Sequence, residues 1–351
     1  MRILIDIGHP AHVHLFRNFA KEMIKRGHKV LFTCRDREFV LYLLQYYGFE
    51  YRNFGKHYKT LQGKTFGIAK NILQMLDVSL VFKPDIYLSH GSTIASFASF
   101  IMKKPHIAFE DTFNMEQVRL SLPFTSVVLT GDYPHPDLGK KEIRYPGYHE
   151  LAYLHPNVYT PDSSVLKTLG VNTDEKYAII RFVGWHATHD IGKKGILNQN
   201  KLKLIEQLSK YIKVFISSER PLPAEFEQYQ IKIKPEQLHD ALYYAQLFIG
   251  EGATTASESA VLGTPAIYIN SSQFGSTDDQ AKYGLLFSYI DSPEDQEKAL
   301  SKAIEIAQID NIKSEFATKR QALLNNKIDV TAFLVWFIEN YPDSEKEIRR
   351  G

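Results

Sequence analysis

The chain has 351 residues, which is long enough for two domains of ordinary size. Its 42 lysines and arginines nearly balance its 40 acidic residues, so the molecule as a whole lacks the strong net positive charge that is typical of nucleic-acid-binding proteins. A single cysteine, Cys34, excludes an internal disulfide and a cysteine-based zinc cluster.

Strand and helix patterns alternate through the first part of the chain. We predict strands at Arg2–Ile7, Lys29–Cys34, Asp85–Ser89 and Pro105–Phe109, with a further strand approached at Gly48–Tyr51. The helical patterns between them cover Val13–Arg26, Arg37–Tyr47, Phe66–Phe82 and Thr93–Met102. This alternation is typical of a parallel sheet with helices on both faces.

A proline-rich stretch then interrupts the alternation, with prolines at 134, 136, 146 and 156, and we interpret it as an interdomain connection. The pattern resumes with strands at Tyr177–Val183 and Lys213–Ser217 and helices at Asn200–Lys210 and Gln237–Ala245. We therefore predict two tandem Rossmann-like, doubly wound α/β domains, residues 1–155 and 160–330, that face each other across a cleft. The last segment, 331–351, contains an aromatic-rich helix that we expect to pack back on the first domain.

The loop after the first strand carries three histidines, His9, His12 and His14. Its sequence lacks the G-x-G-x-x-G pattern of NAD and FAD sites. At the carboxyl edge of a sheet, a histidine is a suitable general base for removing a hydroxyl proton. The main alternative is that one or two of these histidines cap the helix. Zinc binding is a weaker alternative, because these histidines have no acidic or cysteine partner close in sequence.

Two further strand ends of the first domain carry polar residues. Ser89–Thr93 is a strand-to-helix turn in which Ser92 could hold a substrate oxygen or could cap the helix. Glu110 and Asp111 close the next strand, where an acceptor hydroxyl or a sugar could be bound. Because neighbouring strand residues point in opposite directions, we expect only one of these two carboxylates to face the ligand.

Polar residues also follow the first two strands of the second domain. Arg181 lies at the end of the first strand and could neutralise a diphosphate. The loop after it contains Gly184, Trp185 and His186. The backbone at Gly184 could lie against the diphosphate, and Trp185 could stack on a sugar or base. Ser217 ends the next strand and could line the same cleft. A hinge or core role for Trp185 and a capped surface loop at Ser217 are the alternatives.

The most informative segment begins with the apolar run Ala245–Ile249, which we read as a buried strand. A helix of small residues follows, and Gly252, Ala253, Thr254 and Thr255 form the junction. The N-terminus of such a helix offers unpaired N–H groups to a phosphate. Glu258 lies within the helix, where its carboxylate could accept hydrogen bonds from a ribose diol. The alternative is a glycine turn with an exposed glutamate on an ordinary αβ unit.

With these motifs the chain resembles the GT-B nucleotide-sugar enzymes. It resembles more closely a domain-of-unknown-function family that is described as predicted GT-B glycosyltransferases. The resemblance is carried by the late glycine segment and by Gly8–Val13, Tyr145-Pro146-Gly147 with Glu150–Leu154, and Arg181–Asp190. It implies a nucleotide-sugar substrate, no cofactor and no metal requirement.

Similarity to the peptidoglycan N-acetylglucosaminyltransferase implies roles for individual residues. Glu258 matches the residue that holds the nucleotide ribose, and Ala253–Ser257 match the helix start that meets the diphosphate. His12 matches a histidine on the acceptor side, where we also expect His9 and His14. This chain departs from that enzyme at Gly8–Ala11, which replaces a glycine-rich loop.

We therefore expect a glycosyltransferase that moves a sugar from a UDP-sugar donor to a cell-envelope polysaccharide or glycolipid. The resemblance implies an inverting, metal-independent reaction, with His12 as the expected base. One alternative is a non-hydrolysing UDP-N-acetylglucosamine 2-epimerase. That reading is weaker because Ser92 occupies a position where that family carries an acidic residue, and because paired arginines are missing after His186. The other alternative is a nucleotide-sugar-binding subunit without activity.

We expect a cytoplasmic protein with no nucleic-acid partner, because the chain opens directly into a strand and no apolar run approaches a membrane span. Basic and aromatic residues between His57 and Lys70 could bring it to the inner face of the membrane, where a lipid-linked acceptor would lie. A solvated helix and loop is the alternative for that segment.

Overall fold

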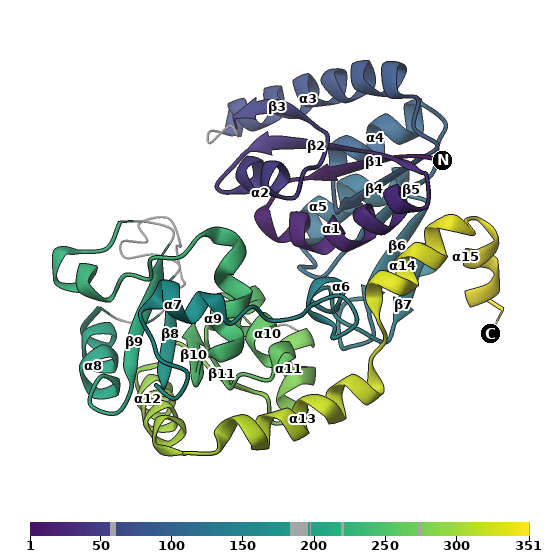
Figure 1. Ribbon diagram of the computed structural model, residues 1–351. Coiled ribbons are helices and arrows are strands. Elements are labelled where there is room, and N and C mark those ends of the chain that lie inside the picture. Colours follow the sequence, from purple (N-terminus) through teal and green to yellow (C-terminus); the bar gives the residue numbers. More distant parts are fainter. Residues whose placement is uncertain (57–60, 183–195, 197, 219–220, 273–274, 351) are drawn as a thin grey trace. The chain divides into compact units, whose positions relative to one another are not determined.

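The computed structural model describes residues 1–56, 61–182, 196, 198–218, 221–272 and 275–350. The chain forms two compact units, one of Met1–Val158 with Ile328–Gly351, the other of Tyr159–Lys327. Each unit is built around one parallel sheet covered by helices (Figure 1). This architecture confirms the prediction of two Rossmann-like α/β domains.

The sheet of the first unit has seven parallel strands in the order β3-β2-β1-β4-β5-β6-β7. These are β1 (Arg2–Ile7), β2 (Lys29–Asp36), β3 (Tyr51–Lys56), β4 (Ile86–His90), β5 (His106–Phe109), β6 (Val127–Gly131) and β7 (Glu142–Tyr145). The central strands are apolar on both faces because helices cover both sides, and Ile3, Leu4 and Ile5 are fully buried. Since all strands run in one direction, the loops that follow them meet at one edge of the sheet, its carboxyl edge.

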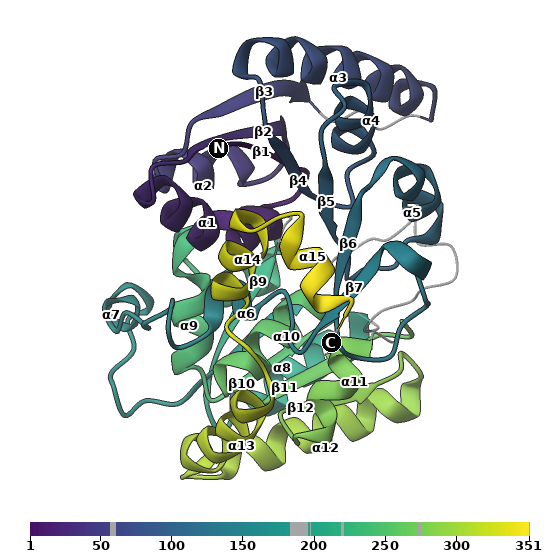
Figure 2. The ribbon, with the colours of Figure 1, turned by 90° about the vertical axis from the view of Figure 1, so that its right-hand side faces the viewer.

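Two groups of helices cover this sheet (Figures 1 and 2). The first group contacts α1 and consists of α1 (Pro10–Lys25), α2 (Val40–Tyr46), α6 (Leu151–Leu154) and α14 (Val330–Glu339), which is followed by α15 (Asp343–Ile348). The second group contacts α4 and consists of α3 (Leu61–Phe82), α4 (Thr93–Ile101), α5 (Met115–Ser121) and the short helix η1 (Leu122–Phe124). A second short helix, η2 (Gly139–Lys141), precedes β7.

The sheet of the second unit has five parallel strands in the order β12-β11-β10-β8-β9. These are β8 (Tyr177–Phe182), β9 (Lys213–Ser218), β10 (Leu247–Gly250), β11 (Ala266–Ile269) and β12 (Leu286–Tyr289). The strand β10 lies in the middle of this sheet, so its carboxyl end has neighbours on both sides. Strands β8, β9 and β10 were predicted from their apolar runs.

The helices of the second unit also form two groups. The helix α8 (Asn198–Leu208) packs on α12 (Pro293–Gln308), and α10 (Ala253–Leu262) packs on α9 (Leu238–Tyr244), α11 (Gly275–Lys282) and α13 (Ile312–Asn326). The remaining short helices are α7 (Ser164–Leu169), η3 (Ala224–Tyr229) and η4 (Pro235–Gln237). The helix α10 ends at Gly263, whose φ of 79° is the left-handed conformation that favours glycine at a helix C-terminus.

Two predictions about the first unit require correction. The proline-rich stretch is not an interdomain connection, because it contains β7 and α6 and lies wholly within the first unit. The short strand β7 is flanked by prolines, which hid its pattern. The helix predicted at Val13–Arg26 already begins at Pro10, because His9 caps it and proline fits the first helical position.

No apolar run in the sequence is long enough to be read as a membrane span. In the described part of the chain, no helix combines the length and the apolar character needed to cross a membrane. The long helix α3 nevertheless carries exposed apolar side chains, among them Leu73, Leu80 and Val81.

Candidate functional site

Three side chains converge at the carboxyl edge of the first sheet: His90 at the end of β4, Asp111 after β5 and His149 after β7. We name them the Asp111 cluster. One carboxylate oxygen of Asp111 lies 2.7 Å from Nε2 of His90, and the other lies 3.0 Å from Nδ1 of His149. The Asp111 side chain is 29 % exposed, whereas both imidazoles are largely buried. A ligand would therefore reach the cluster at Asp111.

The members of the Asp111 cluster change one another's protonation. Burial alone would lower the pKa of His90, but the Asp111 carboxylate outweighs it and raises that pKa to about 9. Burial alone would raise the pKa of Asp111, yet His149 and His90 hold it well below its usual value. At neutral pH the cluster therefore contains an ionised carboxylate beside an imidazolium. Titratable groups perturbed to this degree concentrate at functional sites.

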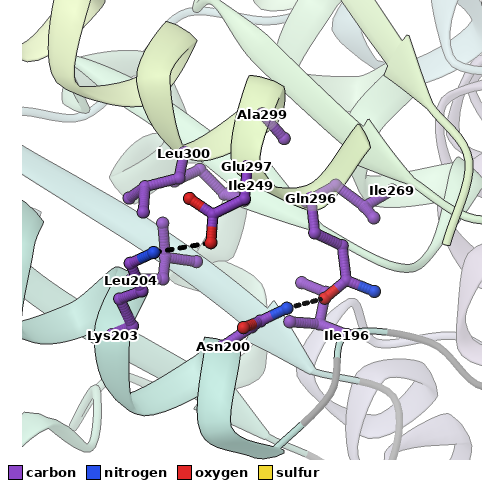
Figure 3. A pocket seen from close by; sticks show the side chains of 10 residues that line it. All are labelled: Ile196, Asn200, Lys203, Leu204, Ile249, Ile269, Gln296, Glu297, Ala299 and Leu300. Carbon is purple, nitrogen blue, oxygen red and sulfur yellow. Dashed lines mark hydrogen bonds and ion pairs between the residues drawn. The ribbon is translucent and has the colours of Figure 1, made fainter. Parts of the chain in front are cut away.

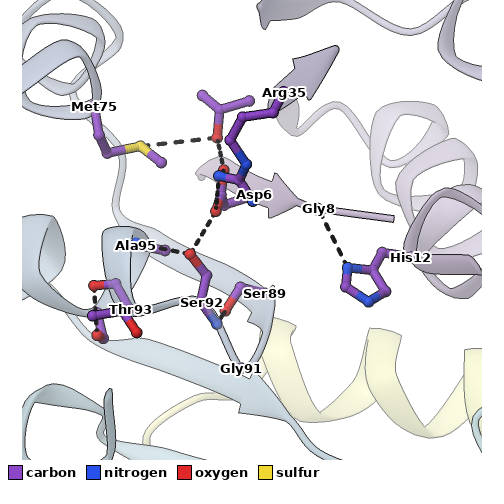
Figure 4. A network of polar contacts seen from close by, with 12 residues as sticks. Asp6, Gly8, His12, Arg35, Met75, Ser89, Gly91, Ser92, Thr93 and Ala95 are labelled. Atoms are coloured by element: carbon purple, nitrogen blue, oxygen red, sulfur yellow. Dashed lines mark hydrogen bonds and ion pairs between the residues drawn. The ribbon is translucent and has the colours of Figure 1, made fainter. Parts of the chain in front are cut away.

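His12 lies against the Asp111 cluster, and its ring stacks on His90 with 4.4 Å between the centroids. The backbone N–H of Gly8 donates to Nδ1 of His12 at 3.2 Å, so the neutral ring carries its proton on Nε2 (Figure 4). Burial, followed by the nearby His90, holds the pKa of His12 well below its usual value. His12 is therefore neutral near pH 7 and presents an N–H donor.

The other two histidines of this loop have different surroundings. His9 is the N-cap of α1, and its Nδ1 accepts a hydrogen bond from the N–H of Ala11 at 3.2 Å. His14 is buried, with Nδ1 3.0 Å from Arg17 and its ring beside Tyr153. Positions 12 and 14 of a helix point about 200° apart, since one turn takes about 3.6 residues. The structure thus does not bring His14 to the Asp111 cluster, and its expected place on the acceptor side stays a prediction.

The structure distinguishes Glu110 from Asp111, a choice that the sequence left open. Oε1 of Glu110 accepts hydrogen bonds from the N–H and hydroxyl of Thr112 and from the N–H of Phe113, at 2.7 to 3.0 Å. Glu110 is only 4 % exposed. Its carboxylate therefore shapes the loop after β5, while that of Asp111 joins the cluster.

Ser92 belongs to a buried polar network around Asp6 (Figure 4). Its hydroxyl donates to Asp6 at 2.5 Å and accepts from the N–H of Ala95 at 3.2 Å, which makes Ser92 the N-cap of α4. Asp6 also accepts hydrogen bonds from Thr33 and Arg35. The hydroxyl of Ser92 thus holds the turn that follows His90, which is the capping role given above as the alternative to substrate binding.

Sequence reasoning did not single out His90 or His149, although both lie in segments that it quoted. His90 stands in the turn Ser89–Thr93, and His149 stands between Gly147 and Glu150. The signal that could have found them is a histidine at or directly after a strand end. For His149 this signal was hidden, because the strand β7 was not predicted.

In the second unit, neighbouring strands bring Arg181, Ser217 and Gly250 side by side. Arg181 on β8 pairs in register with Ser217 on β9 and with Gly250 on β10. The guanidinium of Arg181 donates to the hydroxyl of Ser217 at 3.0 Å. Position 250 requires glycine because a Cβ there would lie 2.6 Å from the ring of Phe248. A cation and a hydroxyl thus lie together near the carboxyl edge of this sheet.

The helix α10 begins directly after β10 at the same edge, which confirms the predicted strand-to-helix junction. Its N-cap is Gly252, and within the described residues no side chain caps the helix. Gly252 and Ala253 are half-buried and Thr254 is exposed, whereas Thr255 and the rest of the helix are buried. The first N–H groups of a helix lack internal partners and carry a partial positive charge. This accessible helix start is therefore suited to bind an anion.

Glu258 lies within α10 and is only 4 % exposed. Its Oε1 is 3.0 Å from Nε2 of His239 on α9, which is also buried. The carboxylate is therefore oriented by His239, and it is not the exposed glutamate of the alternative interpretation.

Some predicted contacts fall on residues that the structure does not describe. Gly184, Trp185 and His186 all lie outside the described residues. The first residues of the basic and aromatic segment from His57 to Lys70 lie outside them as well. The predictions for these positions stay predictions.

A small cavity of about 20 Å³ lies between α8 and α12 (Figure 3). Its rim carries two side-chain contacts, Lys203 with Glu297 at 2.5 Å and Asn200 with Gln296 at 2.6 Å. A cavity of this size holds about one water molecule. It is therefore a packing feature of the α8–α12 contact and too small for a nucleotide.

Family and sequence comparisons find related chains. Residues 1–287 match the family model described as "Protein of unknown function (DUF354)". The uncharacterized protein MJ0665 of Methanocaldococcus jannaschii is 28 % identical over 282 residues, which are 76 % of this chain and 80 % of that protein. The family match extends over most of both units.

Solved structures of nucleotide-sugar enzymes share the fold. A putative UDP-N-acetylglucosamine 2-epimerase from Listeria monocytogenes superposes with a TM-score of 0.70 at 13 % identity, covering 99 % of this chain and 96 % of that one. The UDP-GlcNAc 2-epimerase from Neisseria meningitidis bound to UDP-GlcNAc has a TM-score of 0.65 and 16 % sequence identity, and the match covers 93 % of this chain and 100 % of that one. A spinosyn rhamnosyltransferase complexed with thymidine diphosphate has a TM-score of 0.62 and 13 % sequence identity, and the match covers 97 % of this chain and 100 % of that one. These similarities establish the GT-B fold.

Proposed function

This chain belongs to the family described as "Protein of unknown function (DUF354)", and from that premise we propose that it is a GT-B glycosyltransferase. It moves a sugar from a nucleotide sugar, with UDP as the expected nucleotide, to a cell-envelope polysaccharide or glycolipid. The observation that carries the proposal is the accessible helix start of α10, without a side-chain cap among the described residues, at the carboxyl edge of the second sheet.

The diphosphate of the donor binds at this helix start. Its oxygens accept hydrogen bonds from the N–H groups of Ala253, Thr254 and Thr255, and the helix dipole favours their negative charge. Arg181, beside Ser217, supplies a full positive charge near the same strand ends. These groups also stabilise the diphosphate as it leaves, when its negative charge grows.

Glu258 recognises the ribose of the donor. A carboxylate is acceptor-only when ionised, so it can take hydrogen bonds from both hydroxyls of a ribose diol. The contact with His239 fixes its orientation before the nucleotide arrives. Such preorganisation lowers the entropy that binding would otherwise lose.

The Asp111 cluster binds the acceptor hydroxyl, and Asp111 takes its proton. The hydroxyl oxygen attacks the anomeric carbon, the bond from that carbon to the diphosphate oxygen breaks, and the diphosphate leaves with the electron pair. A single displacement of this kind inverts the anomeric configuration. His12, which carries its proton on Nε2, donates a hydrogen bond to the acceptor oxygen. The role of base expected for His12 thus passes to Asp111, which His90 and His149 hold in place.

Exposed apolar side chains on α3 support a lipid-linked acceptor and contact with a membrane surface. Leu73, Leu80 and Val81 are 68 %, 64 % and 80 % exposed. Leu73 and Leu80 are two helical turns apart and share one side of α3. Replacing both leucines with serine should reduce co-flotation with anionic lipid vesicles. Equal flotation of the variant and the unchanged chain would contradict this part of the proposal.

A non-hydrolysing UDP-N-acetylglucosamine 2-epimerase is the second candidate, favoured by the fold similarity to epimerases of that type. The contacts of two residues count against an epimerase. The carboxylate of Glu110 accepts hydrogen bonds from the loop after β5, and Ser92, where an acidic residue is expected, caps α4.

Incubation with a panel of UDP-sugars, with and without cell-envelope lipid acceptors, tests the proposal. We expect sugar transfer to an acceptor and release of UDP. Conversion of free UDP-N-acetylglucosamine without an acceptor would support the epimerase instead. Nucleotide binding without any product would contradict both catalytic functions.

A further inference from the structure

We propose that the Asp111 cluster binds a divalent transition-metal ion, with His90, Asp111 and His149 as its ligands. One nitrogen from each histidine and one carboxylate oxygen all lie within 4.8 Å of one another. In a tetrahedral zinc site with bonds of about 2.1 Å, neighbouring ligand atoms lie about 3.4 Å apart. The two contacts of Asp111 with the imidazoles, at 2.7 and 3.0 Å, would therefore lengthen slightly as the ion enters. Two imidazoles and one carboxylate are a common ligand set for zinc and for non-haem iron.

The orientation of His90 fits this role. Its Nε2 points at Asp111 at 2.7 Å, so this nitrogen already faces the carboxylate that would share the ion. Histidines that bind metals commonly donate their second ring nitrogen to a backbone carbonyl, which fixes the ring and leaves the other nitrogen for the ion. The sequence offered no such ligand set, because the three residues come from three separate strand ends.

A second, independent observation points to a ligand at the cluster. The hydroxyl of Tyr145 is buried and has no hydrogen-bond partner among the residues that the structure describes. Tyr145 is 1 % exposed, and its ring stacks on that of His149 with 6.4 Å between the centroids. Buried polar groups are nearly always satisfied, and an orphan commonly marks the place of an ion or a water. An oxygen bound to the metal would give the Tyr145 hydroxyl an acceptor.

The partial exposure of Asp111 leaves a coordination position for a further ligand. Three protein ligands with one open position is the arrangement of catalytic zinc sites, whereas structural sites are closed. The open position would accept an oxygen of a water, a hydroxyl or a carboxylate. Metal binding rests on the cluster alone and would stand even if the chain transferred no sugar. With an ion bound, His90 releases the proton that it carries at neutral pH, and metal bonds replace the two hydrogen bonds between Asp111 and the imidazoles. Only one carboxylate oxygen of Asp111 is needed as a ligand, so the other stays available to accept the proton of an acceptor hydroxyl.

The test is titration of the untagged, chelator-treated full chain with Zn²⁺ by calorimetry, and with Co²⁺ by visible absorption. We expect one ion per chain and a Co²⁺ spectrum with imidazole and carboxylate ligands. Asp111→Asn and His149→Gln should each weaken Zn²⁺ binding by more than the roughly 10- to 100-fold typical of changes around the ligands. His28→Gln is the matched control, because His28 also contacts a carboxylate, that of Glu339, away from the cluster. It should leave binding unchanged.

Two results would overturn the proposal. The first is that neither Zn²⁺ nor Co²⁺ binds the unchanged chain. The second is binding that Asp111→Asn and His149→Gln leave as strong as in His28→Gln, which would assign the metal to another site. Far-ultraviolet circular dichroism of each variant establishes that it is folded. UDP titration of the same samples reports on the second unit separately, so a failure of the metal site is distinguishable from a failure of the proposed transferase.

Discussion

Replacing Gly252 by aspartate should weaken nucleotide binding without destabilising the protein. Gly252 is the N-cap of α10, with φ −98° and ψ 122°, a conformation that any residue adopts without strain. Aspartate is among the best N-cap residues and better than glycine by a few tenths of a kcal/mol. Loss of a glycine also reduces the conformational entropy of the unfolded chain, and this raises the free energy of unfolding by roughly 0.4–1 kcal/mol. We therefore expect an unchanged or higher melting temperature.

The same aspartate occupies the N–H groups proposed for the diphosphate and adds a like charge beside them. Two unit charges 4 Å apart repel by about 4 kcal/mol at an effective dielectric constant of 20. Salt reduces this value for a partly exposed site. We expect calorimetry to find UDP bound at least about 30-fold more weakly, which corresponds to about 2 kcal/mol.

Gly252→Asn is the matched control, because asparagine caps the helix with the same shape and without charge. Its affinity for UDP should lie between that of the unchanged chain and that of Gly252→Asp. Equal UDP affinity of the aspartate and asparagine variants, with both folded, would refute the diphosphate site at α10.

Three further predictions concern other residues of the two units. Asp111→Asn should lower the transfer rate at least about 100-fold, which is within the range of general base catalysis. The affinity for UDP measured by calorimetry should stay the same, and an unaltered transfer rate would exclude Asp111 as the base. Glu258→Gln should weaken UDP binding by about tenfold but leave pyrophosphate binding unchanged, and equal losses for both ligands would exclude a ribose contact. Burial lowers the pKa of His106 to about 3, so below pH 6.5 the unfolded chain takes up a proton that the folded chain does not, and stability falls. Between pH 6.5 and pH 5, denaturant unfolding should show that the free energy of unfolding falls by about 2 kcal/mol in the unchanged chain but not in His106→Asn. An equal decrease in the variant would show that other groups cause it.

Strands such as Lys29–Asp36 and Tyr177–Phe182 were predicted, because a parallel strand covered on both faces reads as a short apolar run. The strand Val127–Gly131 is also buried and mostly apolar, but it was not predicted. The strand Glu142–Tyr145 was not predictable in this way. It is four residues long, lies at the edge of its sheet, and has charged side chains at two of its positions.

The two candidate sites, one in each unit, differ in how far the sequence indicated them. The α10 helix start is a local feature, since Gly252–Thr255 follow the strand β10 directly, and local patterns reveal it. The Asp111 cluster is assembled from three strand ends that are distant in sequence. Asp111 was a candidate on its own, but its contacts with His90 and His149 depend on the strand order β4-β5-β6-β7. Such contacts follow from the topology and not from spacing.

A crystal structure of the full chain with UDP tests the central claim most directly. We expect the diphosphate oxygens to lie within hydrogen-bond distance of the backbone N–H groups of Ala253–Thr255, with the ribose beside Glu258. A diphosphate bound at any other place on the chain would contradict it.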